Sequence, residues 1–138
     1  MPADLAGVFF DTSVLVYMLA EADPRAEKAD SLLSEGGVIS VQILNEFTNV
    51  ARRKYVMNWD EIEAALADIK ALCDPILPIT FEDHRSALWI GRRYGYSIYD
   101  AMLIAAASGA GCQILYSEDM QHGQKIEGLT IVNPFVSL

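Results

Sequence analysis

The stretch Val8-Phe9-Phe10-Asp11-Thr12-Ser13 decides how the rest of this sequence is interpreted. Three consecutive apolar residues that give way abruptly to polar ones are typical of a short, buried parallel strand. The segment 13–20 has helical spacing, so Asp11 is predicted to lie where a strand passes into a helix. In a parallel α/β sheet that position is at the carboxyl edge, where ligand sites form.

The same alternation of short strand and helix continues along the chain. Glycine and proline punctuate the segments as short turns, and there is no internal repeat or linker. Helices are predicted over 25–34, 41–55, 59–73, 81–94 and 97–108, and further strands over 38–40, 75–79, 112–116 and 129–132. This order predicts a three-layer α/β fold, with a short central parallel sheet covered by helices on both faces. A chain of 138 residues is expected to form one domain, 1–138.

Composition limits the classes of function. Hydrophobic residues make up 52% and charged residues 21%, which excludes a disordered chain. The net charge of −9 argues against general binding of nucleic acid phosphates, unless part of the acid forms a pocket that cations fill. The basic runs Arg52-Arg53-Lys54 and Arg92-Arg93 either meet phosphates or are solvated helix ends, and the sequence leaves both interpretations open.

The sequence predicts a cytoplasmic protein that does not enter the membrane. Met1 to Gly7 contains no Lys or Arg, and Asp11 interrupts the first apolar stretch, unlike a secretory leader. The longest apolar run, Ala101 to Ala107, is far shorter than the roughly 20 residues that cross a bilayer. It is interpreted as a buried helix.

Four acidic residues are candidates for a functional site: Asp11, Glu46, Asp100 and Asp119. Two of them have an alternative role at a helix start. Asp11 could cap the helix that follows it. Asp100 comes three residues after Ser97, a pattern in which the acid bonds back to the amide of the capping serine.

The other two have weaker alternatives. Glu46 lies beside the apolar stripe of its predicted helix and has no basic residue three or four positions away, so no helical ion pair explains it. Asp119 is in a polar loop, where aspartate is common, and its neighbour Glu118 competes with it for any role.

Taken together, the four carboxylates point to a metal. A cluster of them would repel itself or become partly protonated unless a cation filled it. Divalent ions bound by oxygen ligands are suited to this, and they activate water and stabilise charge in phosphodiester hydrolysis. The two histidines, His84 and His122, are not placed in a recognisable triad, so a nucleophile–histidine hydrolase is disfavoured.

Four segments in order carry a family resemblance: V-F-F-D-T-S (8–13), Q-I-L-N-E-F (42–47), Y-S-I-Y-D-A-M-L-I-A-A-A (96–107) and L-Y-S-E-D-M-Q-H-G (115–123). Together they resemble the PIN domain, and specifically VapC-type toxins. The resemblance covers nearly the whole chain. It implies a Rossmann-like α/β fold and an endoribonuclease that depends on Mg²⁺ or Mn²⁺.

The resemblance also assigns residues and partners. Asp11, Glu46, Asp100 and Asp119 match the four acidic positions, as catalytic residues and metal ligands. Thr12 and Ser117 match hydroxyl positions that help to hold metal-bound water. It further implies a homodimer, an RNA substrate and a small antitoxin whose basic tail enters the acidic groove. Whether Glu118 or Asp119 faces the metal stays open.

Two other functions are weighed against this one. The first is a non-catalytic scaffold of the same fold that binds RNA or protein. The second is a phosphohydrolase or receiver-type acidic pocket, which needs a lysine after a late strand to pair with the phosphoryl group; the late strands offer only Lys125. The RNA target and the number of metal ions are not predicted.

Overall fold

The computed structural model describes residues 7–138 apart from residue 21. The strands are β1 (Val8–Phe10), β2 (Gly37–Ser40), β3 (Cys73–Leu77), β4 (Ile114–Tyr116), β5 (Lys125–Ile126) and β6 (Leu129–Val132). The helices are α2 (Thr12–Leu15), the 3₁₀ helix η1 (Val16–Leu19), α3 (Pro24–Ser34), α4 (Val41–Arg53), α5 (Trp59–Leu72), α6 (Phe81–Tyr94) and α7 (Ile98–Gly109). Strands and helices alternate as the sequence predicts.

The strands form one sheet in the order β3-β2-β1-β4-β6-β5. All neighbouring pairs are parallel except β5 with β6, which is antiparallel. The predicted parallel α/β sheet is therefore confirmed, and the two-residue edge strand β5 is an addition to it. A strand so short has too few residues to show a periodicity in sequence.

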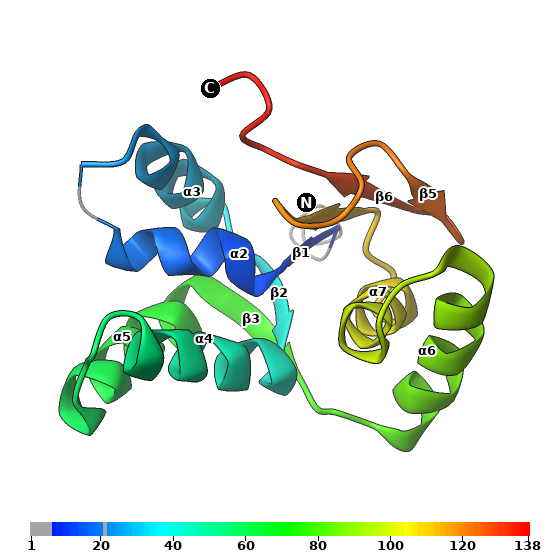
Figure 1. The fold of residues 1–138 in the computed structure, drawn as a ribbon, viewed down its shortest axis with the longest axis horizontal. Helices are drawn as coiled ribbons and strands as arrows, with labels where there is room; N and C mark the ends of the chain where they lie inside the picture. The colour runs from blue at the N-terminus through cyan, green and yellow to red at the C-terminus, as the bar shows by residue number, and fades with distance from the viewer. Residues whose placement is uncertain (1–6, 21) are drawn as a thin grey trace.

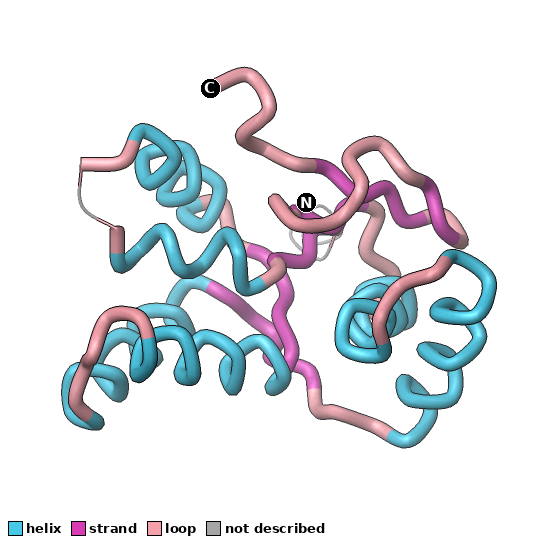
Figure 2. Tube along the Cα trace, in the orientation of Figure 1, coloured by secondary structure: helices cyan, strands magenta, loops and turns pink. Residues whose placement is uncertain are grey.

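Helices cover both faces of the sheet, with α2 to α5 on one side and α6 and α7 on the other (Figure 1). The tube view in Figure 2 shows the strands running between these two groups. Phe9 and Phe10 are both fully buried, because β1 is in the middle of the sheet and has helices on each face. Residues 101–107 of α7 are buried as well, as predicted for that apolar run.

No helix in the described part of the chain is long and apolar enough to cross a membrane. The N-terminal segment that bears on a leader sequence, residues 1–6, lies outside the described residues.

Candidate functional site

The site begins where β1 and β4 end next to each other. The Asp11 amide donates a hydrogen bond to the Tyr116 carbonyl (2.9 Å), which extends the pairing with β4 one residue past the end of β1. The side chain of Asp11 is almost completely buried, and its carboxylate accepts from the Thr12 amide and the Ser117 hydroxyl, each at 2.7 Å. Asp11 is thus held at the carboxyl edge of the sheet, as predicted.

Ser117 fixes both Asp11 and the loop after β4. Its side chain is fully buried; besides donating to Asp11 it accepts from the amides of Asp119 and Met120, both at 3.2 Å. Through these bonds Ser117 positions both Asp11 and the loop after β4, a role that the amino-acid sequence alone does not indicate. The predicted contact of Ser117 with metal-bound water stays a prediction.

Glu46 is brought to the same place by α4. Thr12 donates its hydroxyl to one Glu46 oxygen (2.7 Å), and the amide of Gln42 donates to the other (3.1 Å). Gln42 also donates to the Tyr99 carbonyl (3.0 Å), just before Asp100. Neutral donors therefore orient Glu46, in agreement with the absence of a helical ion pair in the sequence, while they connect α2, α4 and α7.

Asp100 is in the first turn of α7 but does not use its carboxylate as a cap. The Ser97 hydroxyl accepts from the Asp100 amide (3.2 Å), as the sequence pattern predicts. The reciprocal bond from the Ser97 amide to the carboxylate is not found between these two described residues. The carboxylate of Asp100 instead faces the cleft described below.

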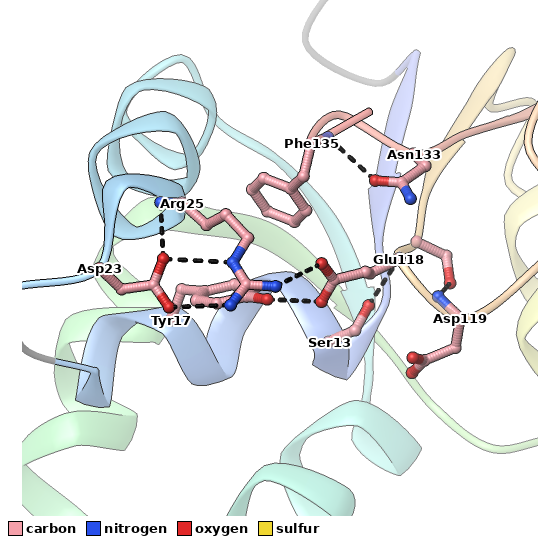
Figure 3. Close-up of polar contacts among 9 residues, drawn as sticks. Ser13, Tyr17, Asp23, Arg25, Glu118, Asp119, Asn133 and Phe135 are labelled. Atoms are coloured by element: carbon pink, nitrogen blue, oxygen red, sulfur yellow. Dashed lines mark hydrogen bonds and ion pairs between the residues drawn. The ribbon is translucent and has the colours of Figure 1, made fainter. Parts of the chain in front are cut away.

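Glu118 and Asp119 have opposite surroundings (Figure 3). Glu118 accepts from the Tyr17 hydroxyl (2.5 Å) and pairs with the Arg25 guanidinium (3.1 Å), which also pairs with Asp23 (3.1 Å). The carboxylate of Asp119 points down in this view, and no dashed line joins it to this group. No hydrogen bond or ion pair to it is found within the described residues. Because the carboxylate of Glu118 is already bound by Tyr17 and Arg25, the geometry favours Asp119 as the residue that serves the site.

All four candidate carboxylates line one cleft of about 600 Å³. Its other walls come from η1, the start of α3 and the end of α4. The lining residues are Asp11, Thr12, Ser13, Val16, Tyr17, Ala20, Asp23, Arg25, Glu46, Asn49, Val50, Lys54, Tyr55, Asp100, Glu118 and Asp119.

The negative charges in the cleft raise the pKa of neighbouring carboxyl groups. Burial raises the pKa of Asp11 to about 6; the bonds from Ser117 and Thr12 oppose the rise, and the charges of Asp119 and Glu46 add to it. Partial burial raises the pKa of Asp100, and the charges of Glu46 and Asp119 raise it further. The pKa of Asp119 is raised by desolvation and then by Glu118. A cation in the cleft would relieve this repulsion.

The donor set fits a hydrated divalent ion better than a closed cage. Within the described ranges, no group of three or more His, Cys, Asp or Glu side chains converges as the ligands of one ion. Mg²⁺ keeps several of its waters and takes only one or two carboxylates. Carboxylates spread along a cleft are compatible with such binding, since those of Asp100 and Asp119 have no hydrogen-bond or ion-pair partner among the described residues.

The sequence has a family match that agrees with this geometry. The family model of the PIN domain matches residues 8–125. The chain belongs to the PIN domain family. The matched segment contains all four carboxylates of the cleft and every strand up to the start of β5.

Solved structures share the PIN fold seen here. VapC20 of Mycobacterium tuberculosis, described as a sarcin-ricin loop cleaving toxin, is 23% identical, with a TM-score of 0.65 over 80% of this chain and 88% of that one. A toxin-antitoxin complex from Klebsiella pneumoniae is 19% identical, with a TM-score of 0.69 over 93% and 98%. DNA-bound VapBC from Salmonella typhimurium is 16% identical, with a TM-score of 0.64 over 91% and 96%. At these identities the likeness shows the fold. No curated protein matches the sequence significantly.

This PIN domain also has cleft residues that the sequence did not single out, among them Tyr17, Arg25 and Tyr55. Arg25 meets Glu118 across 93 positions of sequence, so no local pattern could have indicated the contact. Lys125, which the receiver-type alternative requires, lies on the edge strand β5 and does not line the cleft.

Proposed function

We propose that this PIN domain is an endoribonuclease that depends on Mg²⁺ or Mn²⁺ and is the toxin of a VapBC-type pair. One observation carries the proposal: four carboxylates from separate segments line a single cleft at the carboxyl edge of the sheet. Ion pairing within the described part of the chain does not explain Asp100 and Asp119. The family match and the toxin structures of the same fold support the assignment.

In this proposal some residues of the cleft bind the ion, and others orient the carboxylates that bind it. Asp11, Glu46, Asp100 and Asp119 would hold the ion, directly or through its waters. Such an ion supplies activation of water and stabilisation of charge on the leaving oxygen of the phosphodiester. The hydroxyls of Ser117 and Thr12 would keep the carboxylates of Asp11 and Glu46 oriented, a supporting role that tunes metal ligands.

Replacing Asp100 by asparagine tests the chemistry apart from the fold. We expect Asp100→Asn to abolish cleavage of a structured RNA under Mn²⁺, with a metal-free melting temperature equal to or above that of the wild type, because repulsion is relieved. Asp68, exposed on α5 outside the cleft, provides the matched control: Asp68→Asn should cleave normally. An Asp100→Asn protein that is fully active would remove Asp100 from the site.

The two alternatives make different predictions in the same assay. A non-catalytic scaffold would bind RNA without metal-dependent cleavage in the wild type. An acidic-pocket phosphohydrolase would release phosphate from a small phosphomonoester and leave RNA intact. Since Lys125 is absent from the cleft, the second alternative lacks the cation on which it was based.

We further propose that a small antitoxin with a basic tail enters the cleft, and that both proteins act in the cytoplasm. The acidic cleft supports this through charge complementarity, and an unfolded basic segment would order on binding. Expression of the chain alone should slow growth, and coexpression with the protein encoded by its genomic neighbour should restore it. Harmless expression together with purification of only the free chain would contradict the toxin assignment.

A homodimer is also proposed, formed through the outer side of α6 and α7. Phe81, Leu88, Ile98 and Tyr99 are exposed on these helices. A hollow of about 550 Å³ between α7 and α4 is lined in part by Ile98 and Tyr99. Exposed apolar side chains gathered in this way mark association surfaces. Leu88→Arg should convert the dimer to a monomer in sedimentation, whereas Val56→Arg, at another exposed apolar residue, should not.

A further inference from the structure

The basic run 52–54 at the end of α4 divides into three different environments. The guanidinium of Arg52 lies 4.3 Å from the ring centroid of Trp59 and donates to the Met57 carbonyl at 3.2 Å, so it is used in packing. Arg53 is exposed and does not line the cleft. Lys54 does line it, together with the four carboxylates. Only one of the three cations therefore faces the candidate site.

Lys54 differs from the other cation of the cleft, Arg25. Arg25 is paired with Asp23 and Glu118, both at 3.1 Å. No ion pair of Lys54 is found with any described residue, and its Nζ lies 5.7 Å from the ring centroid of Tyr55. The ammonium of Lys54 is therefore available to a ligand in the cleft, and it lies beside the half-buried ring of Tyr55.

We propose that Lys54 and Tyr55 form a subsite for the nucleotide next to the scissile phosphodiester. Lys54 would pair with a flanking phosphate, for which an ammonium on a flexible stem is suited. The Tyr55 ring would pack against the adjoining base, a contact that does not depend on sequence. This inference rests on the proposed ribonuclease function, and it explains how a chain of net charge −9 retains a phosphate strand.

The matched variants are Lys54→Ala and Arg53→Ala, which remove the same charge from adjacent positions. In an Asp100→Asn background, which is expected not to cleave RNA, the Kd for a fluorescent single-stranded oligoribonucleotide is measured by anisotropy across a salt series. Lys54→Ala should raise Kd about fivefold to tenfold and reduce the salt slope by about 0.7. Arg53→Ala should change Kd less than about twofold, and Lys54→Arg should restore binding. In the otherwise wild-type protein, Lys54→Ala should raise KM more than it lowers kcat.

Two outcomes overturn the subsite in distinguishable ways. If the wild type cleaves RNA and Lys54→Ala weakens binding no more than Arg53→Ala, the subsite is wrong and the ribonuclease function stands. If the wild type neither binds nor cleaves RNA with Mg²⁺ or Mn²⁺, the proposed function fails and the subsite with it.

Discussion

Glu118 and Asp119 show at the residue scale how adjacent acids acquire different roles. Glu118 is held by Arg25 and Tyr17, whereas Asp119 faces the cleft with a raised pKa caused by desolvation and by its neighbour. The sequence could not separate them, because the groups that bind Glu118 come from positions 93 and 101 residues away. The same holds for Ser117, whose three hydrogen bonds all depend on the folded loop.

Replacing Glu118 and Asp119 by their amides should therefore have opposite effects on stability and on RNA cleavage. Glu118→Gln should lower the free energy of unfolding by about 0.5 to 1 kcal/mol, since the pair with Arg25 is partly exposed, while RNA cleavage stays within a few-fold. Asp119→Asn should leave the metal-free stability unchanged or higher and reduce cleavage by more than roughly 100-fold, because a metal ligand matters more than its support. Denaturant unfolding and an RNA cleavage assay on both variants check this. The reverse pattern would assign the site to Glu118.

The raised pKa of Asp11, about 6, predicts a pH dependence of stability. Between the unfolded value near 3.9 and about 6, the folded protein binds more protons, so the free energy of unfolding falls as pH rises through this window. The loss attributable to Asp11 is about 3 kcal/mol and is complete above the folded pKa.

Metal-free unfolding by urea at pH 5 and pH 7 measures this slope in the wild type and in Asp11→Asn. The variant does not titrate at this position, so its stability should fall less between the two pH values. At every pH it lacks one of the two carboxylate oxygens that accept from Thr12 and Ser117, which is why only the slopes are compared. Asp68→Asn is the control. If stability changes equally with pH in Asp11→Asn and in the wild type, the raised pKa of Asp11 is contradicted.

At the scale of elements, local chemistry predicted most of the fold. The predicted helix 81–94 matches α6 because Thr80 caps its start and Gly95 ends it in the left-handed region, with φ of 80°. The predicted helix 97–108 corresponds to α7, and its apolar run 101–107 was equally clear from composition. Strand β3 begins at Cys73, two residues before the predicted start at 75. The apolar pattern of α5 continues to Cys73, so the sequence does not show where the helix ends and the strand begins. Boundaries of this kind depend on pairing with β2, which local sequence does not encode.

Two serines at helix starts provide a test of capping at the same scale. Ser40 precedes α4 and Ser97 precedes α7, but only Ser97 accepts from a helix amide. The Ser40 hydroxyl is buried, with no hydrogen-bond partner among residues 7–20 and 22–138. Ser97→Ala should cost about 1 kcal/mol of stability, and Ser40→Ala should cost less than about 0.5 kcal/mol or stabilise the protein. Thermal unfolding of both variants decides it; an equal loss would show that Ser40 is bonded in solution.

At the scale of the whole molecule, the net charge of −9 is concentrated in part where folding brings separate carboxylates into one cleft. The unfolded chain has no such concentration. A divalent cation should therefore bind the folded state preferentially and raise the melting temperature. General screening of a highly charged protein would also stabilise it, so the comparison must hold ionic strength constant.

A comparison at equal ionic strength separates binding of the ion in the cleft from general screening. Mg²⁺ or Mn²⁺ titrated to the millimolar range, against NaCl of equal ionic strength, should stabilise the wild type by about 3 kcal/mol once the ion exceeds its Kd by about 100-fold. Asp100→Asn and Asp119→Asn should lose most of this gain, whereas Asp68→Asn should keep it, because only the first two remove charge from the cleft. Equal stabilisation by NaCl, or an undiminished gain in both cleft variants, would show that the ions act by screening and that the four carboxylates do not form a metal site.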